Sequence, residues 1–180
     1  MKEDLRREIV LGEGVTAQLD GRVLVVKGPK GEVSRDFRHP KISISIESGK
    51  IVLEAKKGTK REKTGIGSFE SHIKNMVKGV VDPFVYTLKI CSGHFPMNVA
   101  VSGQELTIKN FLGEAVPRKV QLQEGTIVKI NGTDITITSP DKEKAGQTAA
   151  RIESLCRITN RDRRIFQDGI YIVDKAGRAM

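Results

Sequence analysis

Cysteine and histidine side chains are the first candidates for chemistry in this chain. Cys91 and His94 stand three residues apart in Cys91-Ser-Gly-His94, a spacing that suits two ligands of one metal ion. A structural zinc site needs about four protein ligands and a catalytic one about three, and no second pair follows in the sequence. His39 and His72 lie near no serine or cysteine in a recognisable nucleophile motif. The sequence therefore predicts no catalytic residue, no metal site and no cofactor.

Two glycine-containing segments resemble fragments of phosphate-binding loops. Gly28-Pro-Lys-Gly31 and Gly65-Ile-Gly67 both fall short of the complete spacing of such loops. The first is typical of a hairpin turn. The second is expected at a helix start, where backbone amide groups suit an RNA phosphate. Neither segment predicts a nucleotide or other small-molecule substrate.

Basic side chains gather in two clusters. The first is Lys56, Lys57, Lys60, Arg61 and Lys63, with Glu62 as its one acid. We expect it where the first helix begins, on a mobile stretch interrupted by glycine. The second cluster, Asn160-Arg-Asp-Arg-Arg164, crowds three guanidinium groups into the segment between the last helix and the last strand. Arginine offers a planar fork that pairs with phosphate and stacks on bases, so the second cluster is the stronger candidate for an RNA contact.

An internal repeat indicates how these clusters are positioned. The segment from Asp20 to Glu32 matches the segment from Ser102 to Glu114 at a constant offset, which aligns Gly21 with Gly103 and Lys27 with Lys109. A repeat unit of this length is too long for a solenoid turn, so it implies duplicated domains. We predict two tandem domains, 1–82 and 83–180.

Each half has the pattern of a mostly antiparallel sheet covered by one helix, which is an α+β fold. In the first half we expect strands at 16–19, 23–27, 42–46 and 51–55, with turns at Asp20-Gly21 and Ser48-Gly49. Apolar residues from Ile66 to Val80 then recur at spacings of three and four, which predicts a helix. A strand at 83–90 is expected to close this half.

The second half repeats the scheme, with strands expected at 100–106, 116–123, 126–130 and 134–138 and a turn at Asn131-Gly132. Its helix is expected to begin with Ser139 as N-cap and Pro140 as first helical residue, and to bury a stripe from Ala145 to Cys156. A strand at 169–173 closes the chain.

Composition limits the classes of molecule that this chain is expected to bind. The 180 residues carry 31 Lys and Arg against 22 Asp and Glu, a formal charge of +9 that attracts polyanions, of which nucleic acid is the commonest in a cell. No apolar run spans a bilayer or resembles a signal peptide, so we expect a cytoplasmic protein with reduced, buried cysteines and no membrane partner. Aromatic residues are 4% and Trp is absent, which favours folded RNA over single strands.

Three segments resemble a known family. They are the stretch from Ile158 to Lys175, His94-Phe-Pro-Met-Asn-Val99 and Lys109-Asn-Phe-Leu-Gly-Glu114. Together they are similar to the sixth protein of the large ribosomal subunit in its archaeal and eukaryotic form. The compact length and the absence of a bacterial type of ending favour the archaeal branch. Ser154 departs from the signature, which often has Gln at that place.

The resemblance implies a structural protein of the ribosome with no enzymatic activity. It implies binding of large-subunit rRNA, mainly through the C-terminal domain, near the sarcin-ricin loop and the stalk base, with neighbouring ribosomal proteins as further partners. The RNA contacts it implies are Asn160, Arg161, Arg163, Arg164 and Lys175, followed by His94, Lys142 and Lys144. The alternatives are an enzyme that processes or modifies RNA, which lacks a visible site, and a basic architectural protein that binds DNA.

Overall fold

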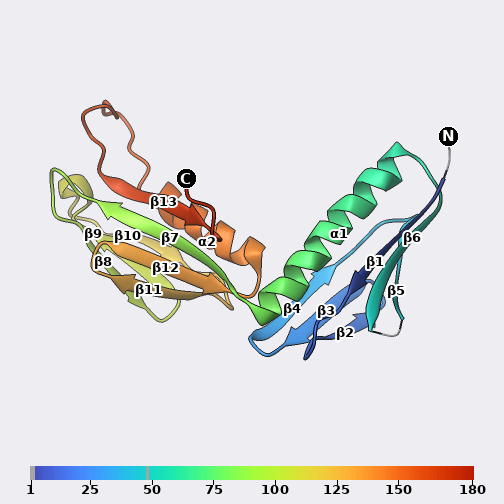
Figure 1. Cartoon of the computed structure of the whole chain (residues 1–180). Coiled ribbons are helices and arrows are strands. Elements are labelled where there is room, and N and C mark those ends of the chain that lie inside the picture. The colour runs from blue at the N-terminus through green and yellow to red at the C-terminus, as the bar shows by residue number, and fades with distance from the viewer. Residues whose placement is uncertain (1–2, 48) are drawn as a thin grey trace. The chain divides into compact units, whose positions relative to one another are not determined.

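The chain divides into two compact units, Met1–Pro83 and Phe84–Met180, which are coloured from blue to green and from green to red in Figure 1. The structure is a computed structural model that describes residues 3–47 and 49–180. Each unit contains antiparallel sheets and one α-helix. The predicted turn at Ser48-Gly49 includes residue 48, which lies outside the described residues.

The described residues of the first unit form six strands and one long helix. They are β1 (Glu3–Val10), β2 (Thr16–Asp20), β3 (Val23–Gly28), β4 (Gly31–Asp36), β5 (Ser43–Glu47), β6 (Lys50–Gly58) and α1 (Lys60–Val81). Two antiparallel sheets form, in the orders β1-β6-β5 and β2-β3-β4. Helix α1 contacts both sheets, through β1 and β6 on one and β3 and β4 on the other. One helix therefore covers two small sheets.

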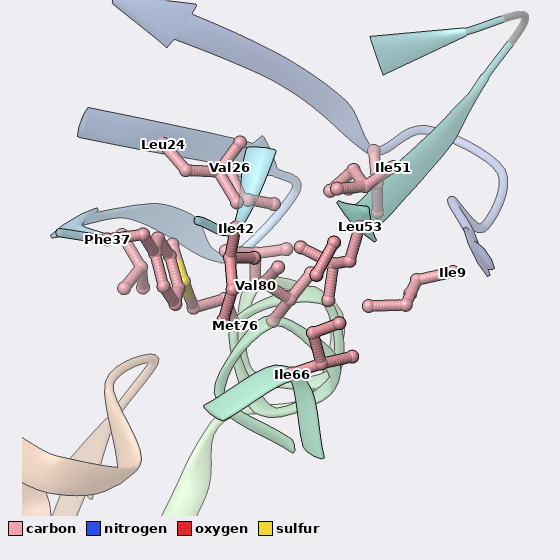
Figure 2. Close-up of a cluster of buried hydrophobic side chains, with 14 residues drawn as sticks. Ile9, Leu24, Val26, Phe37, Ile42, Ile51, Leu53, Ile66, Met76 and Val80 are labelled. Carbon is pink, nitrogen blue, oxygen red and sulfur yellow. The ribbon is translucent and has the colours of Figure 1, made fainter. Parts of the chain in front are cut away.

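The core of the first unit lies between these sheets and α1. Apolar residues alternate along the strands, so that Leu24 and Val26 in β3 are fully buried. Figure 2 shows them turned toward Ile66, Met76 and Val80 of the helix. Because the helical stripe recurs every three or four residues, it presents one continuous apolar face to both sheets.

The basic cluster at residues 56–63 lies almost entirely in regular structure. Lys56 and Lys57 are among the last residues of β6, which ends at Gly58, and Lys60 begins α1. Thr59 is the N-cap of the helix, and its N–H donates to the Glu62 carboxylate at 2.7 Å. The Thr59 hydroxyl also donates to Glu62 and lowers the pKa of that carboxyl to about 2. This capping box keeps the first turn of α1 ordered.

The second unit has seven strands, one α-helix and a short 3-10 turn. They are β7 (Phe84–Cys91), β8 (Asn98–Ser102), β9 (Glu105–Lys109), η1 (Phe111–Gly113), β10 (Arg118–Gln121), β11 (Ile127–Asn131), β12 (Asp134–Ser139), α2 (Lys142–Leu155) and β13 (Gly169–Lys175). Its sheets have the orders β10-β9-β8 and β11-β12-β7-β13. Helix α2 contacts β7, β12 and β13 of the larger sheet and β10 of the smaller one.

The prediction that residues 83–90 close the first half was wrong. They form β7, which lies inside the larger sheet of the second unit between β12 and β13. Strand β1, which the sequence did not predict, takes the equivalent place in the first unit beside β6. Strand β13 has no counterpart in the described part of the first unit, where β1 is an edge strand. The second unit is therefore the duplicated fold with one added strand.

Glycine turns account for the matched hairpins of the two units. Gly21 and Gly103 both adopt a φ of 60°, each as the first residue of a two-residue turn. Such turns need a left-handed residue, which glycine supplies without steric cost. Residues 100–106, predicted as one strand, are therefore divided between β8 and β9. The repeat itself places a turn there, because Gly103 aligns with Gly21.

Helix α2 begins two residues later than predicted. Asp141 is its N-cap, and its carboxylate accepts a hydrogen bond from the N–H of Glu143 at 2.9 Å. Ser139 instead ends β12, where its hydroxyl donates to the carbonyl of Gly125 at 3.0 Å. Pro140 therefore precedes the helix. Asp is as good a cap as Ser, so side-chain type alone did not decide between the two.

The packing of α1 generates a stability prediction. Ile73 has no exposed surface, so Ile73→Ala should lower the free energy of unfolding by about 2 to 5 kcal/mol through lost burial and an unfilled cavity. Urea unfolding followed by circular dichroism measures this change. Ser71→Ala on the exposed face of the same helix is the control and should stay within about 0.5 kcal/mol of the wild type. Equal effects of the two substitutions would contradict the assigned helix face.

Candidate RNA interface

The predicted arginine cluster lies in a loop at one end of the second unit. We call residues 157–168, between α2 and β13, the arginine loop; in Figure 1 it projects beyond the end of β13. Arg161, Arg163 and Arg164 are all exposed on it. Three exposed guanidinium groups within four residues form a concentrated positive surface, provided that the loop is held in place.

A buried carboxylate holds the end of the loop. Asp168, which is 2% exposed, accepts hydrogen bonds at Oδ1 from the backbone N–H groups of Gly93 at 2.6 Å and His94 at 3.0 Å. Its Oδ2 lies 2.5 Å from Nδ1 of the His94 ring. Burial by itself would raise the pKa of Asp168, but the hydrogen bonds from His94 and Gly93 outweigh it and lower that pKa below its ordinary value. The loop is therefore tied to the segment that follows β7.

An aromatic contact joins the same two segments. The rings of Phe166 and His94 lie 4.8 Å apart between centroids, in a tilted arrangement. The guanidinium carbon of Arg161 lies 4.9 Å from the centroid of the Phe166 ring, which is a cation–π contact. Phe166 thus orients one arginine and packs against the anchoring histidine at once.

The tip of the loop is closed by hydrogen bonds to Asp162. Its carbonyl accepts from the N–H groups of Ile165 at 3.1 Å and Phe166 at 2.9 Å. Its carboxylate binds Arg164, with Nη2 and Oδ2 separated by 2.7 Å, and these hydrogen bonds lower the pKa of Asp162. Arg164 is nevertheless 90% exposed at its side chain, so its free edge still faces solvent.

Arg118 secures the other end of the loop. Its guanidinium donates to the carbonyls of Leu155 at 2.7 Å and Arg157 at 3.3 Å, where α2 gives way to the loop. Glu114 holds the guanidinium from the opposite side, with Nε and Oε2 separated by 2.8 Å, and this pairing lowers the pKa of Glu114. The guanidinium also lies 4.2 Å from the ring centroid of the buried Phe111. A cation at the carbonyl end of a helix is favoured by the helix dipole.

The structure separates the predicted RNA contacts into two groups. Asn160, Arg161, Arg163 and Arg164 share the arginine loop, and His94 contacts that loop through Asp168 and Phe166. Lys142 and Lys144 instead lie at the first turn of α2, which is about 20 Å from its last turn for a helix of this length. Lys175 pairs with Tyr86 near the start of β7, and Lys142 lies 5.6 Å from the ring of Phe84 in the same strand. These three lysines are therefore a second basic group, at the opposite end of the unit.

No role was predicted for the residues that position the loop. Phe166 and Asp168 lie in the stretch from Ile158 to Lys175 that resembles the family, and Arg118 lies outside the family-like segments. Their spacing does not indicate their contacts, since Asp168 lies 74 residues from His94 along the chain. A buried acid between a loop and an apolar strand was the one available signal, because such an acid needs hydrogen-bond donors. The expected phosphate site at Gly65-Ile-Gly67 was wrong, since both glycines lie inside α1 and not at its start.

The cysteines and the candidate metal ligands have simple structural places. Cys91 and Cys156 are free thiols; Cys156 is buried, which raises its pKa to about 11, whereas Cys91 is only half-buried at the end of β7. The expectation that both are buried was therefore wrong for Cys91. Among residues 3–47 and 49–180, no three His, Cys, Asp or Glu side chains form a group that could hold a metal ion. In the same part of the chain, none of the helices combines the length and apolar character needed to cross a membrane.

The fold and this loop define a duplicated, basic α+β protein with an anchored arginine surface. Comparisons with a family model and with individual known proteins identify the same family. The family model described as ribosomal protein L6 matches residues 11–82 and 95–169. Large ribosomal subunit protein uL6 of Methanocella arvoryzae is 46% identical over 171 residues, which cover 94% of this chain and 97% of that protein. Its counterpart from Natronomonas pharaonis is 40% identical over 174 residues, covering 97% and 98%.

This chain belongs to the ribosomal protein L6 family. It is accordingly a structural ribosomal protein and not an enzyme, which confirms that prediction. The predicted α+β fold of two duplicated halves is also confirmed, because the family model matches one segment in each half. The resemblance to the archaeal type is confirmed by the archaeal relatives.

The Asp168 anchor generates a prediction about pH. Because its pKa is lowered in the folded chain, the anchor stabilises the fold at pH values above the ordinary pKa of Asp, about 3.9, and loses its effect as the pH falls through the lowered value. Asp168→Ala, which leaves two N–H groups without their acceptor, should lower the free energy of unfolding by about 1 to 3 kcal/mol at pH 7.

Urea unfolding of both proteins from pH 7 to pH 2 measures this difference. As the pH falls below about 5, the difference should shrink because the wild type loses its charged anchor. A difference that grows toward acid pH would contradict the assigned role of the carboxylate.

Proposed function

We propose that this ribosomal protein binds large-subunit rRNA through its second unit, with the arginine loop as the main contact. The single observation that carries the proposal is the loop's geometry: three exposed arginines stand on a segment anchored at one end by Asp168 and at the other by Arg118. Donors that are ordered before binding lose less entropy when they bind.

The three arginines are prepared for different contacts. Arg161 lies over Phe166 and presents its remaining edge to a phosphate or a base. Arg164 is held by Asp162, so a phosphate has to compete with that carboxylate for it. Arg163 is exposed on the same tip. Asn160 adopts a φ of 59°, a left-handed turn that starts this tip just before the arginines. Together these residues suit phosphate pairing on folded RNA.

The second basic group is proposed as a weaker contact. Lys142, Lys144 and Lys175 offer point charges without a planar fork, and they lie at the far end of α2 and β13 from the loop. Such a group extends the positive surface along the unit but does not fix the orientation of a bound phosphate. Its contribution should therefore depend on salt more than on the shape of the RNA.

The place in the ribosome is proposed from the family resemblance. We propose that the loop contacts rRNA near the sarcin-ricin loop and the stalk base, with neighbouring ribosomal proteins at the stalk base as additional partners. The shape of this surface supports an RNA with an irregular fold, since the arginines stand on a projecting loop and not along a flat sheet.

Paired substitutions test the role of the arginine loop. Arg163→Ala with Arg164→Ala should weaken binding of the full chain to large-subunit rRNA by about tenfold or more, because each charged hydrogen bond to phosphate contributes about 1.5 to 3 kcal/mol. Filter binding at one fixed salt concentration measures the affinity, and circular dichroism verifies folding. Lys60→Ala with Lys63→Ala removes the same charge from an exposed helical turn and should have a clearly smaller effect. A larger loss in the lysine variant would place the RNA site in the first unit.

Chemical footprinting tests the proposed location. The wild-type chain bound to in-vitro transcribed large-subunit rRNA should protect nucleotides of the sarcin-ricin loop and the stalk base from hydroxyl radicals. At the same concentration, the Arg163→Ala and Arg164→Ala double variant should protect these nucleotides less than the wild type does. Protections confined to other regions of the rRNA would refute the location while leaving RNA binding intact.

A further inference from the structure

A pocket of about 520 Å³ lies beside the arginine loop, and nothing in the proposed phosphate contacts uses it. It forms where β7 ends and β13 begins, so the central strand β7 and the edge strand β13 of the larger sheet supply part of its wall. Its lining residues are Cys91, Gly93, His94, Ile165, Gln167, Asp168 and Tyr171. This volume is within the range of about 300 to 1,000 Å³ in which proteins enclose small ligands.

The wall of the pocket is held by contacts on both sides. The Tyr171 ring packs so closely over Gly169 that a Cβ there would stand 3.1 Å from the ring. The hydroxyl of Tyr171 donates to the carbonyl of Gln167 at 3.2 Å, which fixes the loop above the strand. On the other side, His94 is held by Asp168. The pocket is therefore formed before any ligand arrives.

The lining suits a flat, uncharged and partly aromatic ligand. His94 and Tyr171 present rings, and Ile165 presents an aliphatic side chain that is 63% exposed and would gain burial from an occupant. Gln167 adds an amide group next to these surfaces. The charged arginines stand on the same loop, where they attract a polyanion to the pocket mouth.

The charge inside the pocket argues against a phosphate as the occupant. Asp168 lines it as a carboxylate whose acceptor positions already bind Gly93 and His94. A second anion beside this buried charge would be repelled, whereas the exocyclic amine of a base would not. Positive charge at the rim and negative charge within therefore match a nucleotide that leaves its phosphate outside and inserts its base.

We propose that this pocket receives a single unstacked nucleobase of the rRNA, while the arginines hold the phosphates that flank it. Bases splayed out of loops and bulges are the usual targets of specific RNA recognition, and they stack on aromatic side chains. The inference rests on the proposed function, because it names the part of the RNA that the same surface takes up.

The duplication supports this assignment to the second unit. In the described part of the first unit, α1 leads at Asp82 into the second unit, with neither a long loop nor an added strand on the open edge of β1. The arginine loop and β13, which supply most of the pocket wall, are thus additions to the duplicated fold. The specific contact should reside where the second unit departs from the first.

Alkylation of Cys91 tests the occupancy of the pocket. The half-buried thiol lines the pocket, whereas Cys156 is buried with a raised pKa and serves as the internal control in the same chain. The full chain is treated with iodoacetamide, with and without in-vitro transcribed large-subunit rRNA, and modification is followed by peptide mass spectrometry. Saturating rRNA should slow alkylation of Cys91 by about fivefold or more. This factor corresponds to about 1 kcal/mol, the lower end of the free energy that stacking of one base contributes.

Heparin distinguishes an inserted base from a covering backbone, because it is a polyanion without bases. It should bind the arginines and leave Cys91 reactive, and equal protection by heparin would overturn the proposal. If rRNA binds with normal affinity and Cys91 still reacts at the free rate, base insertion is refuted and the proposed RNA binding stands. If rRNA does not bind at all, the proposed function itself fails.

A matched pair of substitutions gives a second measurement. Ile165→Ala removes an exposed side chain that the base would cover, and it should weaken rRNA binding by about fivefold through lost apolar burial. Ile127→Ala, at a side chain that is 60% exposed on β11, the edge strand of the larger sheet opposite β13, should leave the affinity unchanged. Because both positions are exposed, both variants should fold, which circular dichroism verifies. Unchanged binding by Ile165→Ala would contradict the proposal.

Discussion

The carboxylate of Asp168, the last residue of the arginine loop, is buried. A buried charge is costly unless donors surround it, and here two backbone N–H groups and one imidazole nitrogen do so. Satisfying that one charge brings the end of the arginine loop to the segment after β7. The aromatic contact of Phe166 with His94, the position of Arg161 over Phe166 and the pocket between the two segments all depend on this connection.

The same loop is held at its other end by a different kind of interaction. Arg118 belongs to the smaller sheet, yet it donates to carbonyls at the end of α2 and is itself oriented by Glu114 and Phe111. Two anchors of opposite charge, one acid and one base, therefore fix a segment that exposes a strong positive surface. The buried Asp168 is satisfied by Gly93 and His94. Arg164 is paired with the exposed Asp162 and keeps one edge of its guanidinium free for RNA.

Duplication and addition explain why the two units differ. The hairpins β2-β3 and β8-β9 have the same turn geometry, and each unit buries one apolar helix face against its sheets. What the second unit adds is β13 on the outer edge of β7, and the loop that leads to it. An edge strand presents unpaired backbone N–H and C=O groups. A further strand can therefore pair with it without changing the rest of the fold. The added segment then carries the arginines.

The sequence by itself determined the class of this fold and its charge. The alternating Ile44 and Ile46 of β5, the helical stripe from Ile66 to Val80 and the turns at Gly21 and Gly132 are local patterns, and each of them appears in the structure where the spacing indicated. Local patterns did not identify β1, because Arg6, Arg7 and Glu8 lie on an edge strand with exposed faces and show no alternation. They also indicated Ser139 as the helix cap where the structure has Asp141, since both side chains are good caps.

Only the tertiary structure decided which sheet takes β7 and which residues hold the loop. The contact between Asp168 and His94 joins residues 74 apart, and that between Arg118 and Leu155 joins residues 37 apart. Such contacts are set by how strands and helices pack after they form, and they leave no spacing in the chain that reports them. The arginines could be recognised from the sequence because their charge is a property of the residues themselves. Their geometry could not, because it depends on distant partners that only folding brings together.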